Sequence, residues 1–272
     1  MQEALGRIES RQLAQLNLSD LRANEFQVYS QWGEDGIIQW LLRNVSVDKR
    51  VFVEFGVEDY AESNTRFLLV NNRWSGLVID SSASNIESLR RDPVYWRHNL
   101  KSSCAFVTRE NIDELIVSQG LKDRVGLLSI DVDGNDYWIW NGITSIDPEL
   151  VIVEYNARFG PHRAVTIPYD PTFRRSLAHH SRVYYGASLA ALTLLGKRKG
   201  YALVGCNSAG NNAFFVKRER LSPAVVERSP EQAFIAAGFR ESRDERGRLA
   251  FLDADAEQRI LENLPLVEVD GS

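Results

Sequence analysis

Residues 51–80 read VFVEFGVEDYAESNTRFLLVNNRWSGLVID, and this stretch decides the fold. It opens with an apolar run, continues through a helix-compatible segment at 64–70, and closes with a second apolar run at 76–79 that ends in Asp80. Strand, turn, helix and strand in this order form one βαβ unit. Gly56 lets the backbone approach a ligand closely, and Asp80 follows it at about the spacing of a carboxylate that binds ribose hydroxyls. The stretch therefore predicts a nucleoside-containing cofactor at the carboxyl ends of parallel strands.

The loop after Gly56 narrows the choice of cofactor. It carries Glu58, Asp59 and Glu62 and has no second glycine. These carboxylates would repel the phosphates of a dinucleotide or a nucleoside triphosphate, and the glycine-rich phosphate cradle is absent. S-adenosylmethionine has no phosphate, and its sulfonium and ammonium groups tolerate nearby acids. The alternative is an ordinary βαβ unit in which Gly56 makes a tight turn.

The rest of the chain repeats the alternation of strands and helices. Further strands are predicted at residues 100–108, 125–131, 150–154, 201–206 and 212–217. The last two form a hairpin, and the others suit a parallel sheet. We therefore expect an α/β, Rossmann-like fold with a mostly parallel seven-stranded sheet, a closing antiparallel hairpin, and helices on both faces. Three strands end in acids, where open α/β sheets keep their ligand sites: Asp80, Asp131 and Glu154.

The net charge and the hydropathy of the chain limit the kinds of partner that it is expected to have. The 272 residues carry a net charge of −5, so no basic footprint for nucleic acid is expected. The apolar runs are too short for a transmembrane segment, and the N-terminus has no signal-peptide core, so we expect a cytoplasmic protein. Residues 1–45 form a helical arm whose apolar stripe packs either on its own core or on another subunit of a homo-oligomer.

Two further segments flank or interrupt the predicted core at 46–218. Residues 157–186 hold three prolines, three of the four histidines and several arginines and tyrosines, and such long inserts are often lids. The tyrosines would stack on sugar faces and the arginines would meet a phosphate or carboxylate. By analogy with such binding loops, we expect a small-molecule or glycan acceptor. Residues 219–272 are charged and weakly periodic, and we expect a C-terminal helical extension.

A set of short motifs carries a family resemblance over residues 29–218: SQWGED at 30–35, VFVEFGV at 51–57, GLVID at 76–80, LLSIDVDG at 127–134 and VIVEYN at 151–156. In this order they resemble the class I S-adenosylmethionine-dependent methyltransferases, and most of all the FkbM-like branch. The resemblance implies a transferase that O-methylates a hydroxyl of a saccharide or a related cell-surface or secondary-metabolite acceptor, as in polysaccharide biosynthesis.

The resemblance also assigns the cofactor site. Glu54 and Gly56 would lie beside the methionine moiety, Asp80 and Ser81 at the ribose, and Glu110 and Asn111 at the adenine, with Asp131 after the fourth strand and Gln31 in a polar cluster that covers the cofactor. Glu58 and Tyr60 depart from the family pattern, since small residues are common there. That departure supports an alternative, a catalytically silent Rossmann-like binding or assembly protein of a polysaccharide pathway.

Removal of the hydroxyl proton has two candidate agents. A histidine of the insert would act as base: His162, His179 or His180. Alternatively Mg²⁺ or Mn²⁺ would lower the pKa of the hydroxyl, held by Asp131, Glu154 and Asn156 with Asp133 in reserve. A sugar hydroxyl is a very weak acid and a lone imidazole is poorly matched to it, so we predict the metal.

Overall fold

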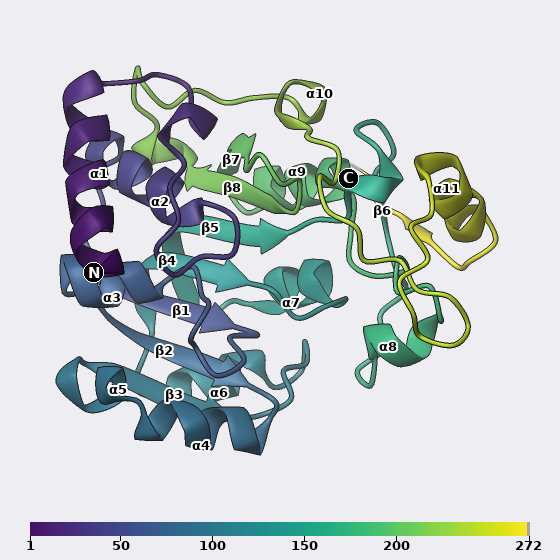
Figure 1. Cartoon of the computed structure of the whole chain (residues 1–272), viewed down its shortest axis with the longest axis horizontal. Coiled ribbons are helices and arrows are strands. Elements are labelled where there is room, and N and C mark those ends of the chain that lie inside the picture. The colour runs from purple at the N-terminus through teal and green to yellow at the C-terminus, as the bar shows by residue number, and fades with distance from the viewer. Residues whose placement is uncertain (271–272) are drawn as a thin grey trace.

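The computed structural model describes residues 1–270, and its centre is one seven-stranded sheet in the order β3–β2–β1–β4–β5–β8–β7 (Figure 1). Neighbours among the first five strands are parallel, and β8 runs antiparallel to both β5 and β7. The predicted fold class is confirmed. The strand bounds are β1 Val51–Phe55, β2 Ser75–Asp80, β3 Leu100–Cys104, β4 Asp123–Ile130, β5 Ile146–Glu154, β7 Tyr201–Cys206 and β8 Asn212–Lys217.

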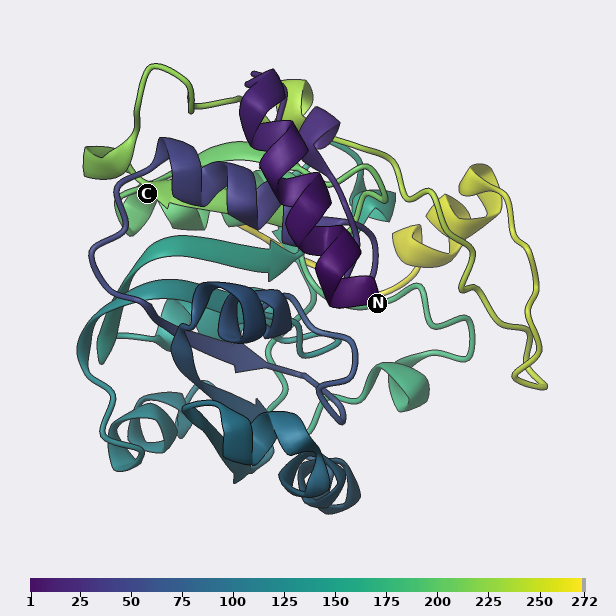
Figure 2. The same ribbon diagram turned by 60° about the vertical axis from the view of Figure 1, so that its left-hand side comes forward.

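Helices cover both faces of the sheet (Figure 2). One face packs against α6 (Ile112–Ser118), α7 (Asp136–Gly142) and α9 (Leu189–Arg198). The other packs against α2 (Glu34–Asn44), α3 (Arg66–Asn72), α4 (Ala83–Arg91) and α5 (Pro93–Arg97). Two layers of helix therefore bury the near-continuous apolar runs of the parallel strands.

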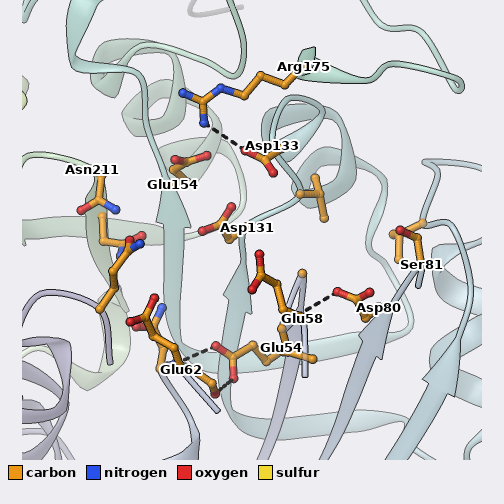
Figure 3. Close-up of a pocket in the computed structure, with 18 of the residues that line it drawn as sticks. Glu54, Glu58, Glu62, Asp80, Ser81, Asp131, Asp133, Glu154, Arg175 and Asn211 are labelled. Carbon is orange, nitrogen blue, oxygen red and sulfur yellow. Dashed lines mark hydrogen bonds and ion pairs between the residues drawn. The ribbon is translucent and has the colours of Figure 1, made fainter. Parts of the chain in front are cut away.

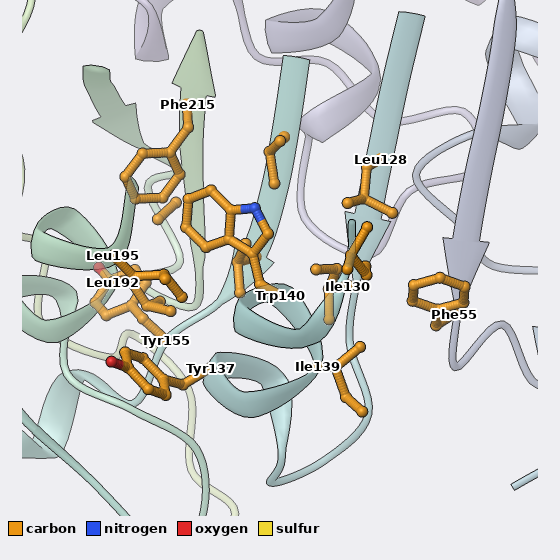
Figure 4. Close-up of a cluster of buried hydrophobic side chains, with 14 of the residues drawn as sticks. Phe55, Leu128, Ile130, Tyr137, Ile139, Trp140, Tyr155, Leu192, Leu195 and Phe215 are labelled. Atoms are coloured by element: carbon orange, nitrogen blue, oxygen red, sulfur yellow. The ribbon is translucent and has the colours of Figure 1, made fainter. Parts of the chain in front are cut away.

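Side chains alternate between these two layers along each strand. Phe52 joins the cluster on the α2–α5 face, whereas Val53 and Phe55 join the cluster on the α6–α9 face. Trp140 of α7 packs on Phe215 of β8 with ring centroids 4.9 Å apart (Figure 4). Such an aromatic pair contributes about 0.5–1.5 kcal/mol beyond its buried area.

The register of the parallel strands places their last residues side by side. Phe55 lies opposite Ile79 and Ile130, and Ile130 lies opposite Val153. The next residue of each strand or its loop therefore belongs to one row at the carboxyl edge of the sheet. We call it the strand-end row, and its members are Gly56, Asp80, Asp131 and Glu154.

The insert at 157–186 and the C-terminal residues lie beyond the arrowheads of the parallel strands (Figure 1). The insert contains η2 (Ala157–Phe159), β6 (Val165–Thr166) and α8 (Arg175–Ala178), and β6 pairs with β9 (Val267–Glu268). Residues 219–270 are irregular for most of their length. Their helices are the end of η3 (Arg218–Arg220), α10 (Pro230–Ala233) and α11 (Ala254–Glu262). Residues 271–272 of the predicted extension lie outside the described range.

The N-terminal arm consists of α1 (Gln2–Leu16), η1 (Arg22–Asn24) and α2. At Gly6 the helix lies so close to Val28 that a Cβ atom would be 2.2 Å from its Cγ2 atom. Leu5, Ile8 and Leu16 of α1 stay exposed. Between residues 1 and 270, no helix combines the length and the hydrophobicity needed to cross a membrane.

Candidate functional site

A cavity of about 570 Å³ opens at the carboxyl edge of the sheet, and all four members of the strand-end row line it (Figure 3). Gln31 and Trp32 line it from the N-terminal arm, and Phe239 lines it from the C-terminal segment. The rings of Trp32 and Phe239 stack with centroids 5.5 Å apart. Two chain segments far apart in sequence thus meet at this cavity, and Gln31, a predicted cofactor residue, belongs to its lining.

Position 56 requires a glycine, because the backbone of the turn after β4 lies against it. Its φ is +72°, and a Cβ atom there would lie 1.6 Å from the carbonyl oxygen of Asp131. The turns after β1 and β4 are therefore in contact, and no side chain fits between them. Because residue 56 is a glycine, it adds no side chain to the floor of the cavity.

The loop after Gly56 adopts backbone conformations usual for glycine without containing glycine. Glu58 has a φ of +48° and Tyr60 a φ of +65°. The Tyr60 ring is fully buried, and its hydroxyl pairs with that of Thr65 at 2.9 Å. Left-handed residues of this kind cost about 1–2 kcal/mol each, and the buried ring and its hydrogen bond help to offset that cost. The departure from the family pattern is thus compatible with an open cavity.

Asp80 ends β2 with its carboxylate at the cavity and is 7% exposed. One of its oxygens accepts the N–H of Glu58 at 2.9 Å, and the other accepts the N–H of Ser82 at 2.8 Å. A carboxylate has about four acceptor positions, so two remain for hydroxyl groups of a ligand. Ser81 also lines the cavity. Both residues suit the predicted ribose site.

Glu54 lines the cavity, but its carboxylate is largely used within the protein. It accepts the hydroxyl of Ser63 at 2.6 Å and the N–H of Asn64 at 2.9 Å, with further hydrogen bonds from Thr65. Burial raises the pKa of Glu54, and these hydrogen bonds oppose the rise. The side chain therefore holds the loop at 63–65 against the strand-end row.

The structure does not bring Glu110 and Asn111 to the cavity. Strand β3 ends at Cys104, four residues before the predicted end, and residues 105–107 line the cavity instead. Glu110 is exposed and accepts the hydroxyl of Tyr169. Asn111 closes its own loop, because its side-chain oxygen accepts the N–H of Thr108 at 2.8 Å. Residues 105–107, Phe106 among them, line the cavity at the end of β3, where the sequence placed Glu110 and Asn111.

Three carboxylates gather at one side of the cavity, with oxygens of Asp131, Asp133 and Glu154 within 4.8 Å of one another. Desolvation raises the pKa of Asp131 well above its ordinary value, and the carboxylates of Asp133 and Asp136 raise it further. Burial likewise raises the pKa of Glu154, and Asp131 adds to that rise. Like charges confined in this way favour either shared protons or a bound cation.

Asn156, the third predicted metal ligand, does not point into this cluster. Its side-chain amide donates to the carbonyl oxygens of Val183 and Tyr185 at 2.9 and 3.0 Å, and its oxygen accepts the N–H of Arg158. It is fully buried and caps η2. The chain turns away after β5, and Asp133 occupies the third position of the cluster instead.

The cluster suits a hard divalent cation. Oxygen Oε2 of Glu154 is buried and receives no hydrogen bond. Arg175 contacts Asp133 at 3.0 Å and compensates part of the charge (Figure 3). Carboxylate oxygens are the ligands that Mg²⁺ and Mn²⁺ prefer, so an unpaired buried oxygen here fits the predicted metal.

The histidines of the insert lie away from the cavity lining. Nδ1 of His179 pairs with the hydroxyl of Ser181 at 2.7 Å, and its ring packs on that of His180. Burial and His180 lower the pKa of His179. His162 is exposed beside Glu231. Within residues 1–270, none of the three lines the cavity, and Asp131 is the predicted catalytic residue that does.

The insert supplies Phe173 and Arg175 to the cavity, and both belong to the aromatic and basic residues that the sequence assigned to the acceptor. Sequence analysis missed other residues of the cavity. Asn211, Phe239 and Glu241 come from the closing hairpin and the C-terminal segment. No local pattern marks these three, since only the folded chain brings them to the sheet edge.

Neither the family models nor the curated proteins contain a match to this sequence. Solved structures do match. One is an S-adenosylmethionine-dependent methyltransferase from Clostridium acetobutylicum, with 10% identity over 78% of this chain and 98% of that one, at a TM-score of 0.41.

Another is an O-methyltransferase from Bacillus cereus in complex with S-adenosylhomocysteine, with 13% identity over 76% and 88% of the two chains and a TM-score of 0.37. The N-terminal domain of EvdMO1 with S-adenosylhomocysteine bound shares 10% identity over 61% and 72%, at a TM-score of 0.38. At such low identities and TM-scores, the function of this chain follows from its own residues and not from these neighbours.

Proposed function

We propose that this chain is an S-adenosylmethionine-dependent O-methyltransferase of the FkbM-like type. The strand-end row carries the proposal: a glycine that keeps the floor clear and an acid with two free acceptor positions lie beside two desolvated carboxylates. Asp80 and Ser81 would hold the ribose, and residues 105–107 would contact the adenine. Gln31 and Trp32 would cover the cofactor.

Charge favours this cofactor over a nucleotide with phosphates. Glu54, Glu58 and Glu62 line the cavity beside Gly56, where the phosphates of a dinucleotide would lie. Burial raises the pKa of Glu62, and Glu58 and Glu34 raise it further. Such an acidic turn attracts a sulfonium and an ammonium group and repels a phosphate.

The acceptor is a hydroxyl of a saccharide or a related molecule. S-adenosylmethionine would supply an electrophilic methyl group. The acceptor oxygen would bond to the methyl carbon as its bond to sulfur breaks, the hydroxyl proton would pass to the carboxylates of Asp131, Asp133 and Glu154, and S-adenosylhomocysteine would leave. Asp131, Asp133 and Glu154 would hold a divalent Mg²⁺ or Mn²⁺ ion, whose chemistry is to lower the pKa of the bound hydroxyl. The chain's own part is to orient the hydroxyl beside Asp131 and to exclude water by means of Trp32 and Phe239.

Calorimetric titration of the full chain with S-adenosylhomocysteine, NAD⁺ and ATP tests the proposal. We expect S-adenosylhomocysteine to bind and the two phosphate-bearing ligands to bind much more weakly, because the turn after β1 is acidic. Binding of NAD⁺ without binding of S-adenosylhomocysteine would refute it. Transfer of the labelled methyl group to an acceptor then separates an enzyme from a silent binding protein, which would bind S-adenosylhomocysteine and never turn over.

A further inference from the structure

A second cavity of about 370 Å³ adjoins the first. The two share part of their lining, including Phe106, Asp133, Phe173 and Arg175. The remaining lining comes from the insert and the C-terminal segment, which lie beyond the carboxyl edge of the sheet (Figure 1). A molecule in the second cavity would therefore reach the strand-end row through the first.

The charge of this cavity is opposite to that of the strand-end row. Four arginines line it, which we call the arginine cluster: Arg174, Arg175, Arg182 and Arg243. Asp133 and Glu241 are the acids in the same lining, and Arg175 contacts both, at 3.0 and 2.5 Å. Four positive charges against two negative ones leave an excess of two.

The other three arginines are available to a ligand. Throughout residues 1–270, no carboxylate forms an ion pair with Arg174, Arg182 or Arg243 within 4.0 Å. The Nε atom of Arg243 is buried and has no hydrogen-bond partner. A buried N–H group without a hydrogen-bond acceptor lowers the stability of the folded protein. A ligand that accepts a hydrogen bond from Arg243 would remove this loss and would bind more tightly for that reason.

Hydrogen bonds hold the cluster together. Nε of Arg175 donates to the carbonyl oxygen of Arg182 at 2.8 Å, and its guanidinium lies 3.6 Å from the ring centroid of Tyr185. The N–H of Arg243 donates to the carbonyl oxygen of Ser181 at 3.0 Å. The backbones of the insert and the C-terminal segment are thus joined, and this brings arginines that are distant in sequence to one cavity.

We propose that the second cavity binds a phosphate group of the methyl acceptor. A phosphate monoester carries about −1.5 to −2 charges at neutral pH, which matches the excess of two, whereas a carboxylate would leave one charge unmatched. Guanidinium groups bind phosphate oxygens in pairs. The inference rests on the proposed function: the phosphate fixes one end of the acceptor at the arginine cluster and directs its hydroxyl to Asp131 and Glu154.

The test is calorimetric titration of the full chain, saturated with S-adenosylhomocysteine, with inorganic phosphate and separately with acetate at constant ionic strength. We expect phosphate to bind more tightly than acetate. The double variant Arg174→Gln/Arg182→Gln should bind phosphate about tenfold more weakly or worse, because charge-assisted hydrogen bonds are lost. The control variant Arg11→Gln/Arg91→Gln removes the same charge from exposed positions on α1 and α4 and should bind as the unmodified chain does.

A parallel phosphate titration is made without S-adenosylhomocysteine. Three outcomes would overturn the inference: equal binding of phosphate and acetate, equal phosphate affinity in the two double variants, or phosphate binding that is seen without S-adenosylhomocysteine and lost in its presence. The last would assign the arginines to the cofactor site. Failure of the unmodified chain to bind S-adenosylhomocysteine is a different result, because it contradicts the proposed function. The two failures are therefore distinguishable in one set of titrations.

Discussion

The strand-end row and the arginine cluster line adjoining cavities, and they differ in charge and in how the chain builds them. Parallel pairing of β1, β2, β4 and β5 places the row, so each member follows directly from a strand. Long-range contacts assemble the cluster instead. Glu241, for example, joins the insert to the C-terminal segment through Arg158 and Arg175. The strand-end row, where we propose that the cofactor binds, thus belongs to the fold, and the arginine cluster, where we propose that the acceptor binds, belongs to segments added to it. We call them the cofactor half and the acceptor half of the proposed site.

Among the variants that compare the two regions, we expect Gly56→Ala in the strand-end row to have the largest effect on the free energy of unfolding. The added methyl group would collide with the carbonyl oxygen of Asp131 at a φ of +72°, so we expect a loss of about 3 kcal/mol or more in the free energy of unfolding. Gly160→Ala is the matched control, since its φ is +73° and no atom lies within 4 Å of the new Cβ. It should cost about 1 kcal/mol. Equal losses in urea unfolding would show that the contact with Asp131 is unimportant.

The sequence predicts the strand-end row better than it predicts the arginine cluster. The apolar runs that end in Gly56, Asp80, Asp131 and Glu154 are local patterns, and parallel register brings their ends together in any such fold. The fold class and the floor of the site are therefore predictable. Asn156 fails as a ligand because its position after β5 says nothing about the direction of its side chain, which forms backbone hydrogen bonds instead.

The remaining errors have the same physical origin. The resemblance placed Glu110 and Asn111 at the adenine, after a third strand expected to run to residue 108. The strand ends at Cys104, and residues 105–107 line the cavity instead. The histidines share the insert with the useful arginines, and composition alone does not separate Arg175 from His179. Only the contacts with Glu241 and Asp133 do so. Segments without strand or helix periodicity have no rule that links sequence position to spatial position.

The second prediction in order of size concerns Asp80. Asp80→Ala should weaken S-adenosylhomocysteine binding by about 1.5–3 kcal/mol, because hydrogen bonds to a charged group are lost. Asp59→Ala removes a neighbouring exposed acid of the same loop that does not line the cavity and should change little. Calorimetry on both variants, with circular dichroism as a check of folding, measures the difference.

The same titration with S-adenosylhomocysteine, carried out on the variant Arg174→Gln/Arg182→Gln, tests whether the strand-end row and the arginine cluster bind different ligands. That variant should keep its affinity for S-adenosylhomocysteine, since the cluster belongs to the acceptor half. Undiminished affinity in Asp80→Ala would contradict the ribose assignment. Strong loss in the arginine variant would contradict the division of the site into two halves.

The smallest expected effect is a gain in stability, and it follows from a comparison of two acids of β5. Glu149 and Glu154 are both buried, but Glu149 pairs with Arg220 at 2.8 Å and accepts the N–H of Asp48. Glu149→Gln should therefore destabilise the protein by about 1–3 kcal/mol. Glu154→Gln removes a carboxylate that repels Asp131, and it should stabilise the protein by about 1 kcal/mol.

The sign of the Glu154 effect depends on pH. Because the folded state raises the pKa of Glu154, the contribution of this group to stability is present at low pH and is lost as pH rises through the raised pKa. The gain from Glu154→Gln should thus appear in urea unfolding at alkaline pH and disappear in acid. Added Mg²⁺ should then stabilise the unmodified chain and not the variant, since a ligand of the native state raises its stability. Equal stabilisation of both, or of neither, would remove the metal from the strand-end row and leave Asp131 and Glu154 to share a proton there.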